Sequence, residues 1–394
     1  MTLRHGREFL AIPGPTTVPD EVLQAMHRPA VEIYAGALAD ITASLHDDMR
    51  TVFRTKGRIY IYAANGHGAW EAAVTNVLSR GDTILVLKSG RFAAGWGQMA
   101  AKLGVAVETV EGDGRRAVDP AEVEDALRAD TAGRIKAVLV VQVDTASGVV
   151  NDIPAMRAAI DAAGHGALLM VDTIASLATM PFEMDDWGVD VAVSASQKGL
   201  MMSPGLSFVA AGKKALAAHD KAGLIASYWD WSAREGELHY QKYCGTPPVH
   251  MLFGLQKALE LLFDEGFDSV FRRHRVIADA VRAAVSVWAA RGPLEFNILA
   301  PGHRADSVTT ILTGDLDPAA LLACCDTELG VVLGIGIGEY TGRAFRIAHM
   351  GHLNAPMILG TLGTVEAALA ALAISHGPGG VQVAVAAIAA ALPA

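Results

Sequence analysis

The chain has 394 residues, of which 52% are hydrophobic and 19% are charged, enough for two domains and a large buried core. Its formal net charge of -10 and its lack of a basic run argue against nucleic acid or an anionic membrane as the main partner. The three cysteines, Cys244, Cys324 and Cys325, form neither a disulfide framework nor a zinc-binding spacing. No N-terminal signal segment and no stretch of membrane-spanning length is present, so we expect a soluble cytoplasmic protein.

An extended arm is predicted for residues 1–20, because Pro13, Pro15 and Pro19 exclude a regular helix or a central strand. Beyond the arm, helical patterns alternate with strands rich in Val, Ile and Leu. The strands are expected at 58–63, 83–87, 105–110, 136–143, 167–171 and in the apolar run before Lys198. The helices are expected at 20–27, 37–54, 68–78, 92–103, 120–128 and 153–163. This alternation predicts an α/β domain with a mostly parallel sheet that is covered on both faces.

The pattern changes in the C-terminal third of the chain. Long helices are predicted at 247–263 and 267–291. Short strands then follow near 295–298, 306–313, 330–333 and 343–349, with helices at 318–325, 354–374 and 380–392. This grouping predicts a smaller α+β domain. We therefore expect an N-terminal arm over 1–20, a large domain over 21–265 and a small domain over 266–394.

One lysine follows a buried segment without an acidic neighbour in the sequence. The apolar run 189–193 ends in the small residues 194–196, which precede Gln197, Lys198 and Gly199. Small residues at a strand end let another group approach the backbone closely. An amine in an apolar, partly desolvated position loses its proton more readily, which suits chemistry. A surface lysine just past a buried strand is the alternative.

Two further candidates stand where a predicted strand ends, the edge at which open parallel sheets bind ligands. The glycine-rich stretch 64–68 precedes a helix, whose free backbone N–H groups can meet a phosphate, although a plain tight turn fits it too. Asp172 directly follows a buried strand, and a buried carboxylate needs a cation or a donor, such as a protonated ring nitrogen. A capping role is the alternative. Asp172 and Lys198 are predicted to share one sheet edge.

Arg346 lies between apolar residues on a predicted strand of the small domain. Its guanidinium suits a bidentate carboxylate, and a structural ion pair is the competing interpretation. Two nearby histidines, His349 and His352, have no further ligands around them, so no metal site is predicted.

Together, a lysine, an acidic partner and a phosphate-binding helix start describe a site for pyridoxal 5′-phosphate (PLP). The lysine holds the aldehyde as a Schiff base, the carboxylate keeps the pyridine nitrogen protonated, and the helix start binds the phosphate. The protonated ring then acts as an electron sink for the substrate α-carbon.

The motifs 194–200 and 172–176, with 13–16 ahead of them and 345–347 behind, resemble those of the class V aminotransferases of fold type I. The sequence is most similar to the serine–glyoxylate and alanine–glyoxylate types. The resemblance covers nearly the whole chain and keeps the family's order of motifs. It implies fold type I, with a mostly parallel seven-stranded sheet in the large domain and a smaller C-terminal α+β domain. It also implies PLP as cofactor and a homodimer or homotetramer with shared active sites.

The resemblance assigns roles to individual residues of this chain. Lys198 and Asp172 are implied as catalytic residues, the Schiff-base lysine and the pyridinium partner. Substrate-binding residues would be Arg346, which clamps the α-carboxylate, and Gly14 in the nearby loop. The remaining cofactor contacts would be Ile174 under the ring, Trp96 stacked on it, Thr145 at the phenolic oxygen, Gly66, His67 and Gln197 at the phosphate, and Tyr243 and Thr246 at the phosphate of a neighbouring subunit.

Two stretches depart from the family's pattern. Residues 31–36 replace a His-Arg-Ser run that is expected to face the substrate, and Val143-Asp144-Thr145 replaces an Asn-Glu-Thr or Gly-Glu-Ser run. The implied activity is a ping-pong transfer of an amino group from a small L-amino acid, serine or alanine, to glyoxylate or pyruvate. The alternatives are an aspartate or ureidoglycine donor, or lyase or aldolase chemistry on a β-hydroxy amino acid. A cofactor-binding sensor or scaffold is disfavoured, because all three charged site residues are present.

Overall fold

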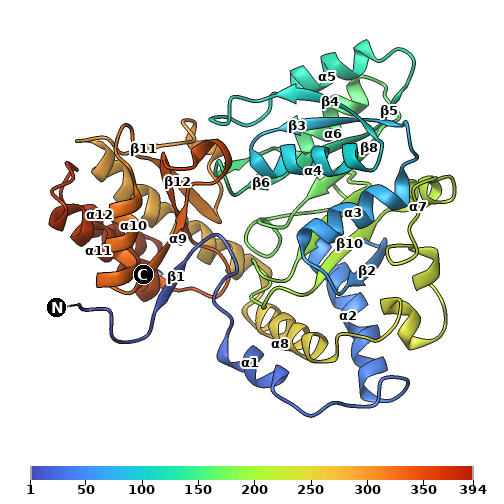
Figure 1. The fold of residues 1–394 in the computed structure, drawn as a ribbon, viewed down its shortest axis with the longest axis horizontal. Coiled ribbons are helices and arrows are strands. Elements are labelled where there is room, and N and C mark those ends of the chain that lie inside the picture. Colours follow the sequence, from blue (N-terminus) through green and yellow to red (C-terminus); the bar gives the residue numbers. More distant parts are fainter. Residues whose placement is uncertain (1, 393–394) are drawn as a thin grey trace.

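The computed structural model describes residues 2–392, which form two sheets with helices packed against them. In Figure 1 the larger sheet lies on the right, and the smaller sheet lies on the left with the C-terminal helices. The division into residues 21–265 and 266–394 stays a prediction. It fits the strands, because the larger sheet lies within 58–211 and four of the five strands of the smaller one follow residue 294.

The larger sheet has seven strands in the order β2-β10-β9-β8-β5-β3-β4, and only β10 runs against the others. Their bounds are β2 Arg58–Tyr62, β3 Thr83–Lys88, β4 Ala106–Glu111, β5 Ile135–Val141, β8 Leu168–Asp172, β9 Val191–Ala195 and β10 Ser207–Ala211. The predicted fold of a mostly parallel sheet is confirmed. The strand β10 was not among the predicted ones, because its short sequence, Ser-Phe-Val-Ala-Ala, also fits a buried helical segment.

Helices cover both faces of this sheet, and each face has its own apolar core. One core contains Leu45, Met156 and Leu252, and the other contains Trp70 and Trp96. The helices are α1 Asp20–Met26, α2 Ala37–Phe53, α3 Gly66–Val77, α4 Arg91–Lys102, α5 Pro120–Ala129, α6 Ile153–Ala162, α7 Lys213–His219 and α8 Val249–Glu265. A short hairpin of β6 Val143–Asp144 and β7 Val149–Val150 follows β5.

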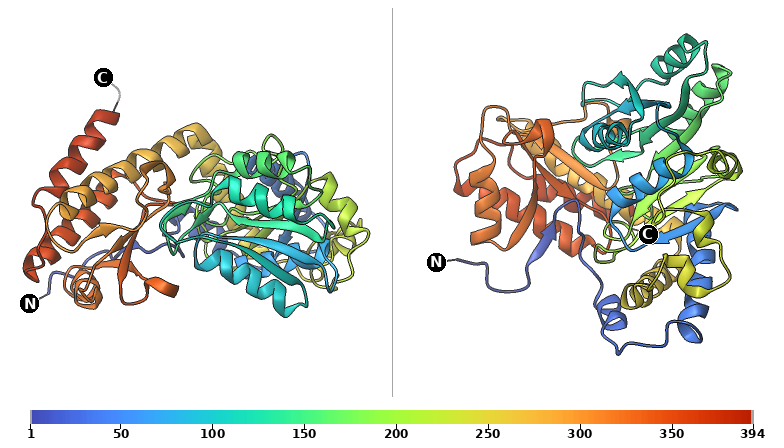
Figure 2. Two further views of the ribbon diagram at one scale, coloured as in Figure 1. Left: turned by 90° about the horizontal axis from the view of Figure 1, so that it is seen from above. Right: turned by 45° about the vertical axis from the view of Figure 1, so that its right-hand side comes forward.

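The smaller sheet has the order β1-β13-β14-β12-β11. Its strands are β1 Phe9–Ala11, β11 Glu295–Phe296, β12 Val308–Leu312, β13 Val331–Ile335 and β14 Ala344–Ala348. The helices beside it are α9 Phe267–Ala289, α10 Ala319–Ala323, α11 Ala355–Ala371 and α12 Gly380–Ala391. Figure 2 shows α12 at the end of the molecule far from the larger sheet. The arm is not wholly irregular, because β1 pairs in parallel with β13 and joins it to the smaller sheet.

None of the helices within residues 2–392 is both long and apolar enough to cross a bilayer.

Two histidines, His349 and His274, lie fully buried near the smaller sheet. His349 contacts the carbonyl of Asp306 at 2.8 Å through Nδ1 and the hydroxyl of Thr309 at 2.9 Å through Nε2. His274 contacts the carbonyl of Val270 through Nδ1 and accepts the N–H of Gly351 through Nε2. Burial lowers the pKa of His349 to about 4 and that of His274 to about 3.

These depressed pKa values predict acid sensitivity. Below pH ~6.5 these histidines bind protons in the unfolded chain but stay neutral in the folded protein. The free energy of unfolding therefore falls as the pH drops from ~6.5 towards 4. Each histidine contributes a slope of up to about 1.4 kcal/mol per pH unit. Urea unfolding of the wild type and of His349→Gln between pH 7 and pH 5 checks this. The variant should start less stable and lose less on acidification, whereas the exposed His27→Gln should keep the wild-type slope. Equal slopes for the wild type and His349→Gln would contradict the assignment.

Candidate active site

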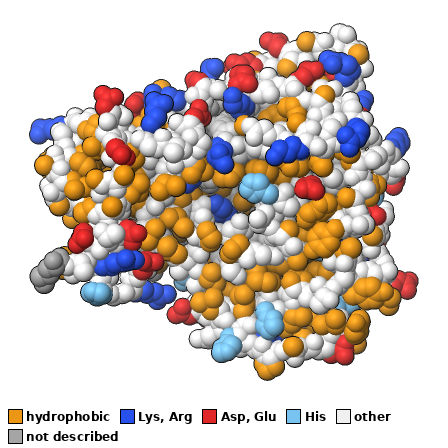
Figure 3. All heavy atoms as spheres, in the orientation of Figure 1, with side chains coloured by type: hydrophobic (Ala, Val, Ile, Leu, Met, Phe, Trp, Pro, Cys, Tyr) orange, Lys and Arg blue, Asp and Glu red, His pale blue; other side chains and the backbone are white. Residues whose placement is uncertain are grey.

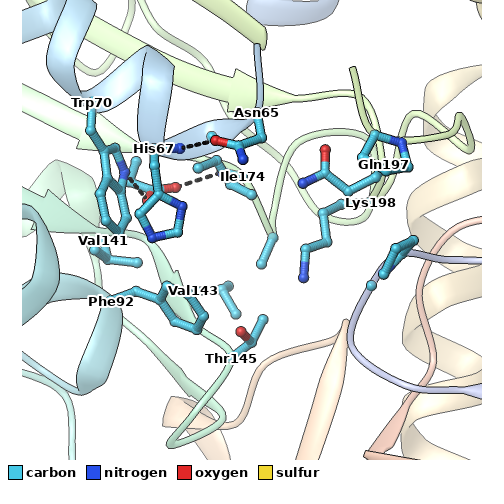
Figure 4. A pocket seen from close by; sticks show the side chains of 16 residues that line it. Asn65, His67, Trp70, Phe92, Val141, Val143, Thr145, Ile174, Gln197 and Lys198 are labelled. Atoms are coloured by element: carbon cyan, nitrogen blue, oxygen red, sulfur yellow. Dashed lines mark hydrogen bonds between the residues drawn. The ribbon is translucent and has the colours of Figure 1, made fainter. Parts of the chain in front are cut away.

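A cavity of about 260 Å³ lies at the carboxyl ends of the central strands of the larger sheet. It brings together most of the residues singled out from the sequence. Figure 4 shows the amine of Lys198 pointing into it, across from His67 and Phe92. The lining residues are Gly14, Pro15, Asn65, Gly66, His67, Trp70, Phe92, Val141, Val143, Thr145, Asp172, Ile174, Ala175, Gln197, Lys198 and Pro204.

Lys198 follows β9 and is 9% exposed. Burial and, to a smaller extent, the charge of Arg346 lower the pKa of its amine to about 8, against the opposing effect of Asp172. Among the described residues no carboxylate lies within 4 Å of the amine, which contacts the carbonyl of Pro13. Other residues are disfavoured at position 14, because the φ of Gly14 is +88° and a Cβ there would displace the end of the lysine side chain, which would lie 2.6 Å away. The site therefore holds a desolvated amine that is not engaged in an ion pair.

The N-terminal arm fixes the backbone on both sides of this lysine. Thr16 donates its N–H to the carbonyl of Gln197 at 3.1 Å, and its hydroxyl donates to the carbonyl of Lys198 at 3.0 Å. Because β1 anchors the arm in the smaller sheet, the amine is positioned by contacts from both parts of the molecule.

Asp172 is the last residue of β8 and is 2% exposed. Its carboxylate accepts the indole N–H of Trp70 at 2.7 Å and the backbone N–H of Ile174 at 2.7 Å. Burial nevertheless raises its pKa to about 7. No cation of the described chain lies within 4 Å of it. A buried carboxylate without a cation is costly in a structural role and suits a positively charged ligand.

The start of α3 forms the opposite rim of the cavity. Asn65 caps the helix, since its side chain accepts the backbone N–H of His67 at 3.1 Å and of Gly68 at 3.4 Å. Gly66 lets Ile174 pack closely against the helix start, because a Cβ there would lie 2.3 Å from the end of the Ile174 side chain, which would have to move. Gln197 faces the same rim, and its buried Oε1 has no hydrogen-bond partner among the described residues. The positive end of a 12-residue helix together with these groups can bind an anion.

Arg346 on β14 is 7% exposed, and burial lowers its pKa to about 10. Its Nη1 donates to the carbonyl of Thr145 at 2.8 Å and its Nε donates to the carbonyl of Ile335 at 2.7 Å. Within residues 2–392 no carboxylate lies within 4 Å of the guanidinium, so the structural ion pair considered above is not formed. Thr145 lines the cavity, and Arg346 lies directly behind it.

The prediction that Trp96 stacks on a ligand is wrong. Trp96 is fully buried under Trp70, with the two rings nearly parallel at 6.0 Å, and it does not line the cavity. The aromatic wall comes from Phe92, in the first turn of α4, together with His67 and Trp70. A tryptophan one helical turn further on faces the core instead.

Tyr243 and Thr246 do not line the cavity of their own chain. Tyr243 is buried, and its hydroxyl lies 2.8 Å from that of Thr42, whereas Thr246 is exposed. Their predicted role at the phosphate of a neighbouring subunit stays a prediction.

Several lining residues were not assigned a role from the sequence. Asn65 had a signal, because asparagine directly before a helix start is a preferred cap. Trp70 and Phe92 had none, since their roles depend on how α3 and α4 approach the ends of β8 and β5. No group of three or more His, Cys, Asp or Glu that could hold a metal ion occurs among residues 2–392.

Comparisons with known proteins agree with this geometry. The family described as "Aminotransferase class-V" matches residues 9–341. The serine–glyoxylate aminotransferase of Methylorubrum extorquens is 39% identical over 96% of this chain and 95% of its own length. The L-aspartate–glyoxylate aminotransferase of Paracoccus denitrificans is 36% identical over 92% of this chain and 91% of its own. The crystal structure of pyridoxamine–pyruvate aminotransferase from Mesorhizobium loti covers both chains fully with a TM-score of 0.91 at 27% identity. The chain therefore belongs to the class V aminotransferase family, as its sequence motifs predicted.

Proposed function

We propose that this protein is a PLP-dependent aminotransferase that moves an amino group from a small L-amino acid, of the serine or alanine type, to glyoxylate or pyruvate by a ping-pong mechanism. The observation that carries the proposal is the pairing of a desolvated amine, Lys198, with an uncompensated buried carboxylate, Asp172, in one cavity. Two similar proteins, the serine–glyoxylate and the L-aspartate–glyoxylate aminotransferase, share glyoxylate in their names, which supports that acceptor.

The residues present fit PLP. Lys198 would bind its aldehyde, and Asp172 would face its ring nitrogen, where a positive charge removes the penalty of burying the carboxylate. The backbone N–H groups at the start of α3 and the side chain of Gln197 would hold its phosphate. Phe92 and Ile174 line the space for the ring, and Thr145 offers a hydroxyl near it. When bound, PLP supplies an electron sink for the bond that breaks at the substrate α-carbon.

The chain's own groups then handle the proton and the substrate. Because its pKa is lowered to about 8, about a tenth of the Lys198 amine is neutral near pH 7, far more than for an ordinary lysine. Its Nζ can therefore accept the proton from the substrate α-carbon and donate it again later in the transfer. Arg346, which lacks a carboxylate partner, would bind the substrate carboxylate and hold the α-carbon in front of this amine.

The lining of the cavity favours small, uncharged donors. The only basic side chains that line it within the described chain are His67 and Lys198, and the guanidinium of Arg346 lies behind Thr145. A second carboxylate on the donor therefore finds no arginine among the lining residues. Aspartate remains the second candidate because of the similar L-aspartate–glyoxylate enzyme.

The purified protein loaded with PLP and mixed with L-serine, L-alanine or L-aspartate tests the proposal. We expect serine or alanine to convert the cofactor to its amino form, seen as loss of the visible band, and glyoxylate to restore that band. Conversion by none of the three would contradict aminotransfer. Product formed without an acceptor would indicate lyase or aldolase chemistry instead.

We also propose a homodimer with shared active sites. The exposed side chains of Tyr34, Tyr228, Leu238 and Tyr240 are large and apolar, and Tyr34 contacts Tyr240 edge to face. Figure 3 shows apolar side chains gathered on the surface over the part of the molecule that holds α2 and α8 in Figure 1. Thr246 lies exposed in the same part of the chain, which suits a role at the site of a second copy. A cytoplasmic location is proposed from the three free cysteines.

A further inference from the structure

A second buried carboxylate, Asp144, lies next to the active site and has no part in the chemistry above. It is the last residue of β6 and is fully buried. Its Oδ2 accepts the backbone N–H of Phe92 at 2.8 Å and of Ala93 at 3.2 Å, and its Oδ1 accepts the N–H of Ala146 at 2.9 Å. One side chain therefore joins the first turn of α4 to the loop that follows β6.

Both joined segments carry a wall of the cavity. Phe92 is the aromatic residue of the α4 turn, and Thr145 is the hydroxyl residue of the loop. The carbonyl of Thr145 accepts the Nη1 of Arg346, and the carbonyl of Ala146 accepts the hydroxyl of Thr310. Through this loop, Asp144 connects the aromatic wall to the proposed carboxylate-binding arginine of the small domain.

Helix capping alone does not account for this arrangement. Asp119 and Asp152 cap α5 and α6 from the adjacent position in the sequence, and both side chains are exposed. The residue directly before α4 is Gly90, which makes no side-chain cap. The carboxylate that accepts the first N–H groups of α4 instead belongs to Asp144, 52 positions from Phe92 in the sequence, and it is fully desolvated. Asp144 is also the one carboxylate whose charge raises the pKa of Arg346, against the lowering that burial causes.

Gly90 makes this approach possible. A Cβ at position 90 would lie 2.4 Å from the carboxyl carbon of Asp144. Its φ of 170° is extended backbone that other residues adopt, so the requirement for glycine here is steric.

We propose that Asp144 is a positioning residue that fixes the aromatic wall at Phe92 relative to Arg346, so that the ring of the cofactor and the carboxylate of the substrate meet in register. The proposal rests on the proposed function through the carboxylate-binding role of Arg346. An asparagine at 144 keeps one acceptor and turns an NH₂ group towards backbone donors, which breaks one of the two attachments.

The test compares Asp144→Asn with the matched cap variant Asp152→Asn, using PLP-loaded protein. For Asp144→Asn we expect the KM for the carboxylate substrates, L-serine and glyoxylate, to rise about tenfold with a smaller change in kcat. We also expect the visible circular dichroism of the bound cofactor to change, because its ring loses a fixed neighbour. Asp152→Asn keeps the acceptor that caps α6, so its Tm and both readouts should stay at wild-type values.

Wild-type KM and circular dichroism in folded Asp144→Asn would overturn the proposal. If that variant does not fold, Gly90→Ala decides, because it displaces the same carboxylate from the other side: a raised KM supports the role and an unchanged KM overturns it. A wild type that fails to load PLP on Lys198 would instead contradict the proposed function itself, so the two failures are distinguishable.

Discussion

Replacing Lys198 by alanine is expected to abolish turnover and the visible absorbance of the lysine-bound cofactor. The substitution removes the only described amine that points into the cavity, and with it both the attachment point of the aldehyde and the group that moves the proton. Loss of a positioned acid–base group alone lowers rates by about 10²–10⁴-fold, and loss of the covalent link adds to it. Absorbance spectra and initial rates with the best donor measure both effects.

The control is Lys213→Ala, because Lys213 is exposed at the start of α7 and lies outside the cavity. It should keep wild-type spectra and rates. Thermal unfolding of Lys198→Ala should give a Tm near that of the wild type without cofactor, since the lost amine was desolvated and made no ion pair. Turnover at the wild-type rate in Lys198→Ala would exclude the mechanism.

The sequence carried enough information to predict the sheet and the edge at which the site lies. The strands are short apolar runs separated by helices of ten or more residues, and that pattern admits few arrangements. Because the carboxyl ends of parallel strands share an edge, Asp172 at the end of β8 and Lys198 after β9 were expected to lie close together, and both line one cavity. That inference needed no side-chain geometry.

The wrong assignment of Trp96 shows which part of the site the sequence does not predict. Phe92 and Trp96 are four residues apart on α4, so both belong to roughly the same helical face, and the sequence does not say which turn of the helix reaches the cavity. The crossing of α4 over the sheet decides it: the first turn meets the loop of Asp144, and the second turn is buried under Trp70. Packing between distant segments settles such choices.

Replacing Asp172 by asparagine is expected to lower kcat by about 10²–10⁴-fold while PLP still attaches to Lys198. The carboxylate is the group that would hold a proton on the ring nitrogen, and an amide cannot stabilise that positive charge. Its contacts with Trp70 and Ile174 place it rigidly, so the effect arises from the lost charge more than from the lost position. Steady-state rates and the spectrum of the loaded variant measure it.

Asp190→Asn is the matched control, because Asp190 also accepts a backbone N–H at 2.8 Å, from Leu169, but does not line the cavity. Rates of the folded control protein should stay at the wild-type value. An equal loss of activity in both variants would mean that Asp172 acts only by holding the fold.

The pH dependence of stability separates charge from structure at Asp172. In the protein without cofactor, burial holds its pKa at about 7, above the ordinary value of ~3.9 for an unfolded chain. A raised pKa means that the folded state binds the extra proton, so its stabilising contribution is complete below pH ~4 and is lost as the pH rises towards 7.

Asp172→Asn lacks this loss of stability with rising pH, because asparagine does not ionise. Relative to the wild type, the unloaded variant should therefore gain stability between pH 4 and 7, by up to about 1.4 kcal/mol per pH unit. Urea unfolding at several pH values measures this difference, and a constant difference would show that the pKa of the Asp172 carboxyl is not raised in the folded state. If Asp172→Asn gains stability and loses turnover, the buried carboxylate of Asp172 serves to bind the positively charged cofactor ring and does not stabilise the fold.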